Sequence, residues 1–122
     1  MKVAVTTAEP GLDVAVEERF GRAPYFMIVE TDDMSFEAVE NPAAEAAGGA
    51  GPQAAQAVAE LGATAVLTGN CGPKAHRTLQ GAGVKTIVGV TGTVREAVER
   101  FLAGEYEEAT EPNVSGHFGM GQ

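Results

Sequence analysis

The sequence predicts a single α/β domain with a mixed five-stranded sheet. A chain of 122 residues has the length of one domain with one hydrophobic core. Short runs rich in β-branched and aromatic residues open the chain, and strand-like runs alternate with helical patterns after residue 50. We therefore expect the order β-β-β-α-β-α-β-α, with helices on the faces of the sheet.

The first three expected strands lie at residues 2–7, 25–31 and 34–41. The first, KVAVTT, is a β-branched run of the kind found in buried strands. The second, YFMIVET, is rich in aromatic and β-branched residues, and a turn at Asp32–Asp33 separates it from the third. The short connections favour an antiparallel arrangement.

The second half of the chain predicts strands and helices in alternation. Thr93 and Glu96 have the spacing of a capping box, in which the Thr side chain caps a helix and the Glu reaches back. Two right-handed crossovers make the strands at 2–7, 64–69 and 84–90 parallel. The expected helices are one whose first residue is Pro52, one that begins at Pro73 and is stopped by Gly81 and Gly83, and one after Thr93 that Gly104 ends.

The chain shows no internal repeat and no second domain. We assign residues 1–104 to one domain and residues 105–122 to a C-terminal tail that is acidic and then Gly-rich. Such a composition is typical of a loose terminus.

Composition and charge exclude several classes of protein. The net charge of −9 repels the phosphate backbone, so nucleic acid is not an expected partner. No apolar run approaches the ~18 residues of a membrane span, and we expect no membrane partner. A lone cysteine argues against a disulfide framework and fits a reducing cytoplasm, where we expect the protein to be.

Loops rich in Gly, Thr and Asn follow the three strands expected to be parallel. They are TTAEPG after the first strand, TGNCGP after the fourth and VTGT after the fifth, and GGAGP before the first helix can lie nearby. Ligands bind at the carboxyl ends of such strands, and backbone amides at helix N-termini attract anions. The alternative is that these glycines serve turn geometry alone.

Cys71, in LTGNCGPKAHRTL, precedes the second expected helix. A helix N-terminus lowers the pKa of a thiol, so Cys71 can be a thiolate ligand, a nucleophile, or a small residue in a tight turn. Arg77 and Thr78 complete the spacing of a cysteine-dependent phosphatase loop. Pro73, however, lacks an amide that such a loop needs, and a helix from Pro73 would point Arg77 away from its start.

Arg19 and Arg22 bracket Phe20 and Gly21 before the second strand. They can neutralise a bound anion, or they can be exposed partners of nearby glutamates. In the tail, His117 and Met120 are possible ligands of a soft metal. His76, on the second expected helix, is expected to be solvated.

Four stretches together resemble the dinitrogenase iron-molybdenum cofactor biosynthesis family, which includes small NifX-like proteins. They are RFGRAPYFMIV, GGAG, AVLTGNCGPKA and TGTVREAVERFLAG. The resemblance implies a ribonuclease H-like three-layer fold and the binding of a metal-sulfur cluster that contains molybdenum, iron or both. One departure is Arg19, where family members commonly have histidine before Phe-Gly.

We therefore expect a non-catalytic protein that binds, carries or assembles an anionic metal-sulfur cluster or its precursor. The alternatives are a phosphatase that uses Cys71 and Arg77, or a protein-interaction module that docks a cluster-assembly partner. Nuclease activity is rejected, because the first strand lacks the acidic residue that two-metal cleavage requires. The residues expected to bind the cofactor are Arg19, Phe20, Gly21, Arg22, Gly69, Asn70, Gly72, Thr91 and Gly92, and the expected metal ligands are Cys71 and His117.

Overall fold

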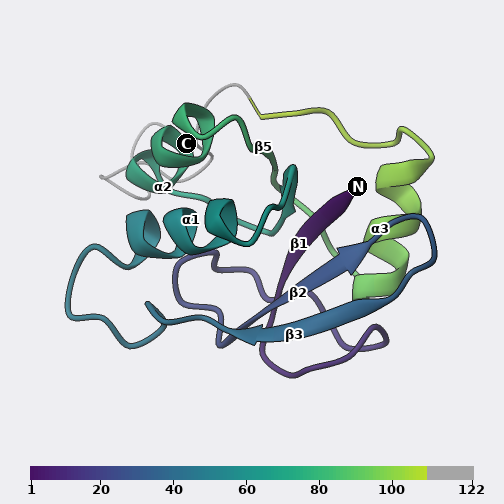
Figure 1. Cartoon of the computed structure of the whole chain (residues 1–122), viewed down its shortest axis with the longest axis horizontal. Helices are drawn as coiled ribbons and strands as arrows, with labels where there is room; N and C mark the ends of the chain where they lie inside the picture. The colour runs from purple at the N-terminus through teal and green to yellow at the C-terminus, as the bar shows by residue number, and fades with distance from the viewer. Residues whose placement is uncertain (110–122) are drawn as a thin grey trace.

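The computed structural model, which describes residues 1–109, contains the eight expected elements in the expected order (Figure 1). The elements are β1 (Lys2–Thr7), β2 (Tyr25–Glu30), β3 (Phe36–Glu40), α1 (Ala50–Glu60), β4 (Ala65–Leu67), α2 (Pro73–Gly81), β5 (Lys85–Ile87) and α3 (Val94–Leu102). The prediction of the fold class is confirmed.

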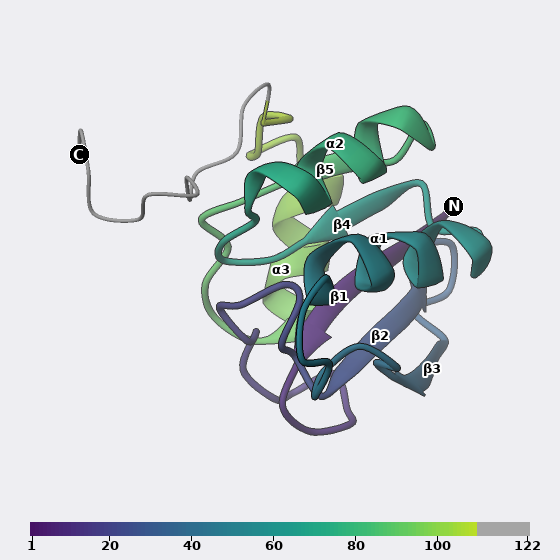
Figure 2. The same ribbon diagram turned by 90° about the vertical axis from the view of Figure 1, so that its left-hand side faces the viewer.

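The five strands form one open mixed sheet in the order β3-β2-β1-β4-β5. The strands β1, β4 and β5 are parallel, and β2 and β3 extend the sheet as an antiparallel edge. Helices α1 and α2 lie side by side on one face, and α3 lies on the other (Figures 1 and 2). This is the three-layer, ribonuclease H-like arrangement that the sequence predicts.

Side chains that alternate along the strands fill two cores, one on each face of the sheet. Ala4 and Val66 point toward α1 and α2, whereas their neighbours Val3 and Leu67 point toward α3. β1 is buried on both faces because it lies in the middle of the sheet, which explains its continuous apolar sequence.

Several strands are shorter than the sequence predicts, because turn geometry interrupts them. The third strand, expected from residue 34, begins at Phe36. Met34 has a left-handed φ of 63° and donates its backbone N–H to Glu30 O at 2.8 Å, which closes the turn instead of extending the strand. The fifth strand ends at Ile87 and not at residue 90, since Gly89 turns the chain with a φ of 73°.

The first helix begins at Ala50, two residues before the expected start at Pro52. Gly49 is its N-cap, with a left-handed φ of 70°. Pro52 therefore occupies the third helical position. A proline is tolerated there because the first-turn amides of a helix have no intrahelical acceptor.

Within residues 105–109, expected to be the start of a loose tail, Tyr106 and Ala109 contact the domain. Ala109 donates its backbone N–H to Thr86 O in β5 at 2.7 Å. The Ala109 carbonyl oxygen lies 3.1 Å from His76 Nε2. His76 is consequently buried, with 3% of its surface exposed, and the expectation of a solvated histidine is wrong. The remaining tail, with His117 and Met120, lies outside the described residues.

The helices are short, with 11, 9 and 9 residues. Among residues 1–109, none combines the length and the apolar character needed to cross a membrane. The N-terminus of α3 has the predicted capping box: Glu96 N donates to Thr93 Oγ1 at 3.1 Å, and Thr93 N donates to Glu96 Oε1 at 2.9 Å. Both bonds satisfy amides that would otherwise lack a partner.

The substitution Thr93→Ala should lower the free energy of unfolding by about 1 kcal/mol, because it removes the acceptor for the Glu96 amide. Thr78→Ala is the matched control, since the Thr78 hydroxyl donates to Lys74 O within the same helix, α2, and caps no helix end. Urea denaturation of the two variants measures the difference. Equal stability of both variants would show that the cap contributes nothing.

Candidate functional site

An open cavity of about 580 Å³ lies at the carboxyl end of β4, between the first turns of α1 and α2 and the loop that precedes β2. Three segments that are distant in sequence line it. The lining residues are Arg19, Phe20, Gly21, Gly49, Ala50, Gly51, Pro52, Asn70, Gly72, Pro73, Lys74 and Ala75. Most are small or apolar, so the cavity combines an apolar surface with exposed backbone.

Two helix N-termini face this cavity. The N-cap of α1 is Gly49 and that of α2 is Gly72, and neither helix has a side-chain capping hydrogen bond. Pro52 and Pro73 have no N–H, and the other amides of the two first turns lack an acceptor from a cap or from the helix itself. Because the helix dipole is positive at this end, both termini favour a negatively charged ligand.

Small residues allow the three segments to meet. A Cβ on Gly21 would lie 3.0 Å from Gly51 N, and a Cβ on Gly51 would lie 3.1 Å from Ala75 Cβ. The loop before β2 thus rests on the first turn of α1, which in turn rests on α2. Larger side chains here would push the helix N-termini apart.

The loop that precedes β2 is also hydrogen-bonded to the loop that follows β4. Asn70 N donates to Glu18 O at 2.6 Å, and Phe20 N donates to Asn70 O at 3.2 Å. At Gly69 the two backbones approach so closely that an added Cβ would lie 2.8 Å from Glu18 Cα. This contact explains why a glycine follows Thr68.

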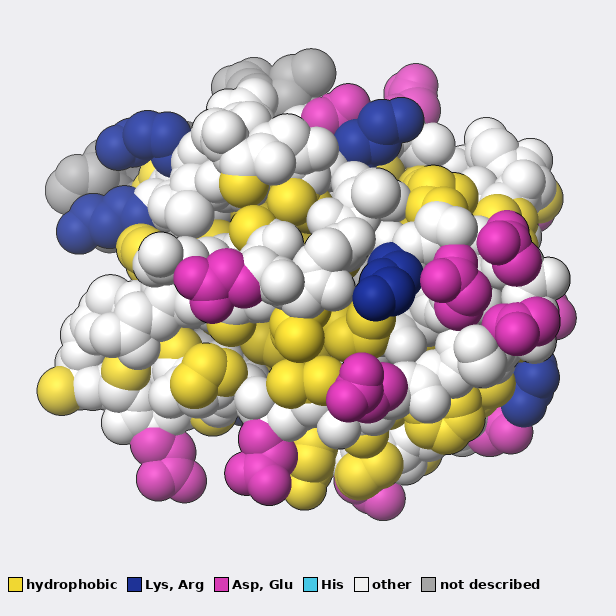
Figure 3. Space-filling model, in the orientation of Figure 1, with side chains coloured by type: hydrophobic (Ala, Val, Ile, Leu, Met, Phe, Trp, Pro, Cys, Tyr) yellow, Lys and Arg dark blue, Asp and Glu magenta, His cyan; other side chains and the backbone are white. Residues whose placement is uncertain are grey.

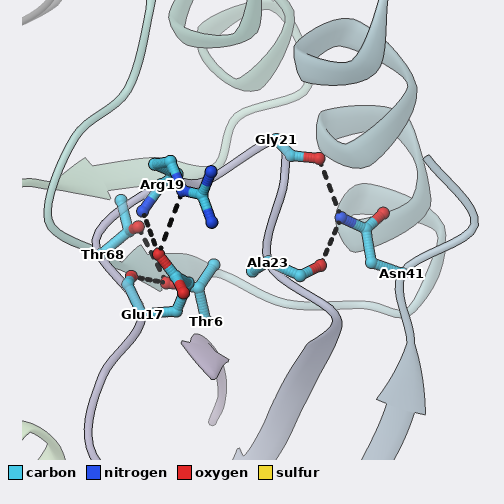
Figure 4. A network of polar contacts seen from close by, with 7 residues as sticks. All are labelled: Thr6, Glu17, Arg19, Gly21, Ala23, Asn41 and Thr68. Carbon is cyan, nitrogen blue, oxygen red and sulfur yellow. Dashed lines mark hydrogen bonds and ion pairs between the residues drawn. The ribbon is translucent and has the colours of Figure 1, made fainter. Parts of the chain in front are cut away.

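Buried polar side chains hold the same loop from its two ends (Figure 4). Thr6 Oγ1 donates to Glu17 O at 2.7 Å and lies 2.8 Å from Thr68 Oγ1. Asn41 Nδ2 donates to Gly21 O at 3.0 Å and to Ala23 O at 2.8 Å. The path of residues 17–23 is therefore fixed by the ends of the strands β1, β3 and β4.

Arg19 and Lys74 add positive charge to the rim of the cavity. Both side chains are exposed. On the face seen in Figure 3, acidic side chains are spread over much of the surface, and a group of Lys and Arg side chains stands out at the upper left, on the side of α2. The region around α2 therefore differs in charge from the rest of an acidic molecule.

Five of the nine residues expected to bind a cofactor line this cavity, namely Arg19, Phe20, Gly21, Asn70 and Gly72. Phe20 is buried and packs on Phe26, with ring centroids 5.9 Å apart. Asn70 lines the cavity, but its backbone N–H donates to Glu18 O. The backbone N–H groups of the α2 first turn are therefore better placed to donate to a ligand. The remaining four expected residues do not line the cavity.

Arg22, Gly69 and Gly92 have structural contacts elsewhere. Arg22 donates through Nη1 to Ala44 O at 3.2 Å and to Ala46 O at 2.7 Å, which fixes the turn before α1. Gly69 lies under the backbone of Glu18. Thr91 and Gly92 precede α3, on the other face of the sheet, where Gly92 O accepts from Val16 N at 2.9 Å. The expected convergence of the loops after β1 and β5 on this site is not observed.

Cys71 does not line the cavity, and its thiol is buried in the core under α1 and α2. Only 1% of the residue is exposed, and Sγ lies 3.8 Å from Gly72 O. Burial raises the pKa of Cys71 to about 12, above its ordinary value of 9.0. The prediction that the helix N-terminus lowers the pKa of Cys71 is wrong, because loss of hydration outweighs the effect of the helix N-terminus.

This geometry also counts against the phosphatase alternative. A nucleophilic cysteine must be a thiolate at the surface of its site, whereas Cys71 is buried and protonated. Arg77 is exposed on α2 and is not among the residues that line the cavity. Within residues 1–109, no group of three or more His, Cys, Asp or Glu side chains could hold a metal ion.

Sequence reasoning missed Lys74 and the first turn of α1 as parts of the site. GGAGP was expected only to lie nearby, and its residues Gly49–Pro52 form one wall of the cavity. The sequence could have indicated Lys74, because a residue that follows the helix-initiating Pro73 lies in the first turn of α2.

Comparisons with known proteins agree with this fold. The family model described as "Dinitrogenase iron-molybdenum cofactor" matches residues 1–104. An uncharacterized protein of Methanocaldococcus jannaschii, MJ0580, is 33% identical over 92 residues, which are 73% of this chain and 78% of that protein. The chain belongs to the dinitrogenase iron-molybdenum cofactor family.

Solved structures include similar proteins. The apo form of the orange protein from Desulfovibrio gigas is 46% identical and superposes with a TM-score of 0.89, with 92% of this chain and 95% of that one covered. The Thermotoga protein TM1290, of the DUF35 family, is 38% identical with a TM-score of 0.75, and the match covers 88% and 91% of the two chains.

Iodoacetamide should label Cys71 slowly in the folded protein near pH 8. A pKa of about 12 in place of 9.0 makes the thiolate about a thousandfold rarer, and burial blocks the reagent as well. The same protein unfolded in urea should react at the rate of an ordinary thiol. Rapid labelling of the folded chain would contradict the burial of Cys71.

The raised pKa also gives a direction for stability against pH. Below about pH 9 the thiol is protonated in both states; above it the unfolded chain loses the proton first, and folding becomes less favourable as pH rises toward 12. The wild type should therefore lose more stability than Cys71→Ala between pH 9 and 11. Denaturant unfolding of both proteins across that range measures the difference.

The substitution Gly69→Ala should destabilise the fold by about 1–3 kcal/mol, because the new Cβ meets the backbone of Glu18. Gly81→Ala is the matched control: its Cβ meets no atom within 4 Å, and it should stabilise α2 by about 0.5–1 kcal/mol. Urea denaturation compares the two. A neutral Gly69→Ala would mean that the two loops can separate freely.

Proposed function

We propose that this protein binds and carries an anionic metal-sulfur cluster, or a precursor of one, in the cavity between α1 and α2. The observation that supports the proposal most is the convergence of two uncapped helix N-termini with Arg19 and Lys74 in one cavity of an acidic chain. Such a site attracts a negative ligand that the overall charge of −9 would otherwise repel.

The apolar part of the cavity favours a sulfide-rich anion over a small hydrated one. Phe20, Ala50, Ala75 and two prolines supply this surface. A large anion that spreads its charge over several sulfur atoms costs less to remove from water than a compact phosphate. The N–H groups of the α2 first turn and the guanidinium of Arg19 then supply hydrogen bonds to it.

Membership of the iron-molybdenum cofactor family supports a cluster of this kind as the cargo, with molybdenum, iron or both. The orange protein of Desulfovibrio gigas was solved in an apo form, which implies that a relative 46% identical to this chain also has a ligand. Binding to backbone amides and cations lets a cluster enter and leave without exchange of protein ligands. This suits a carrier, for which no catalytic residue is needed.

Tetrathiomolybdate, added without oxygen and followed by its visible absorption, tests the proposal. The wild type should bind it. Arg19→Gln and Lys74→Gln should each weaken binding by about twofold to fivefold, the effect of losing one exposed charge contact. Arg77→Gln is the matched control, because it makes the same charge change on α2 outside the cavity.

Two outcomes would contradict this assignment. No binding of tetrathiomolybdate by the folded wild type would reject the proposed cargo class. Equal losses in Arg77→Gln and Lys74→Gln would mean that overall charge, and not this cavity, attracts the anion.

A further inference from the structure

We infer that Glu17, which does not line the cavity, is the positioning residue for Arg19. This inference rests on the proposed function, since it assigns how one cation of that site is held in place. The Glu17 carboxylate accepts two hydrogen bonds through Oε2, from Arg19 N at 3.1 Å and from Arg19 Nε at 3.4 Å. One oxygen atom thus fixes both the backbone and the side chain of Arg19.

Glu17 is itself held firmly. Its backbone N–H donates to Thr6 O at 2.7 Å, and its carbonyl oxygen accepts from Thr6 Oγ1 at 2.7 Å. Thr6 Oγ1 in turn lies 2.8 Å from Thr68 Oγ1, and both threonines are buried. The carboxylate therefore projects from a backbone anchored at the ends of the two central strands, and only 18% of the Glu17 side chain is exposed.

Arg19, in contrast, has 67% of its side chain exposed, and a long exposed side chain samples many rotamers unless something restrains it. The bond from Nε to Glu17 is such a restraint. Figure 4 shows the end of the guanidinium turned away from Glu17. In the described part of the chain Arg19 donates to Glu17 through N and Nε and not through either Nη. The two Nη groups are the donors left for a ligand in the cavity.

Three backbone N–H groups of the two loops already have acceptors within the protein. Arg19 N is directed to Glu17, Phe20 N to Asn70 O, and Asn70 N to Glu18 O. Among residues 19–21, which line this wall of the cavity, Arg19 is the one cationic side chain, so the orientation of its guanidinium matters. Pre-orientation lowers the entropy lost when a ligand binds.

A simple charge argument predicts the opposite role for Glu17. A carboxylate beside an anion site repels the anion, so its removal by any substitution should tighten binding. The two ideas are separated by comparing Glu17→Gln with Glu17→Ala. Both variants remove the same charge, but only glutamine keeps an oxygen that can accept from Arg19 N and Nε.

The test measures tetrathiomolybdate affinity of the full chain in both variants, alone and combined with Arg19→Gln. Glu17→Ala should bind about twofold to fivefold more weakly than Glu17→Gln, the factor expected for one ordered charge contact. In the Arg19→Gln background the two should bind equally. Glu18→Ala serves as a control, since it removes a neighbouring charge that does not contact Arg19.

Equal affinities of Glu17→Ala and Glu17→Gln with Arg19 present would overturn the inference. A second measurement does not depend on the cargo: the Arg19 Nε–H signal in nitrogen-15 NMR. It should exchange slowly with water in the wild type and in Glu17→Gln, and rapidly in Glu17→Ala. If the wild type binds no tetrathiomolybdate, the proposed function fails, and rapid exchange of this signal in the wild type would separately reject the role of Glu17.

Discussion

The close approach of two backbone segments at Gly69 is the constraint on which the site depends. The loop before β2 crosses the end of β4 at a distance that no Cβ would permit, and hydrogen bonds on either side of Asn70 hold it there. Because of this contact, Arg19 and Phe20 lie beside the first turn of α2, although about fifty residues separate them in the chain. Gly21, Gly51 and Ala75 extend the same close packing to α1.

The local charge at the cavity is opposite in sign to the net charge of the molecule. An acidic surface keeps polyanions away, while two helix dipoles and two cations make one cavity locally positive. The cavity is also largely apolar. An anion that spreads its charge and is weakly hydrated suits all three conditions, and the proposed metal-sulfur cargo is of this kind.

Cys71 illustrates how one local rule can be outweighed by another. Its position before α2 satisfies the sequence rule for an activated thiol. The side chain nevertheless points into the core shared by α1 and α2, and burial raises the pKa of Cys71 to about 12. In the structure its neighbours Asn70 and Gly72 line the cavity while Cys71 packs behind them. A cysteine at a helix start is thus a packing residue when its rotamer faces inward.

The sequence by itself determined the order of the strands and helices, the capping box at Thr93 and Glu96, and the motifs that contain Arg19 and Asn70, which it offered as candidates among nine binding residues. These features are local patterns or motifs, so nearby residues suffice to specify them. Only the tertiary structure decided that Thr91 and Gly92 lie away from the cavity, that the first turn of α1 and Lys74 belong to it, and that Glu17 holds Arg19. The physical reason is that a loop's sequence specifies its turn but not its neighbours. Those neighbours depend on which face of the sheet each helix covers and on how closely glycines let separate backbones approach.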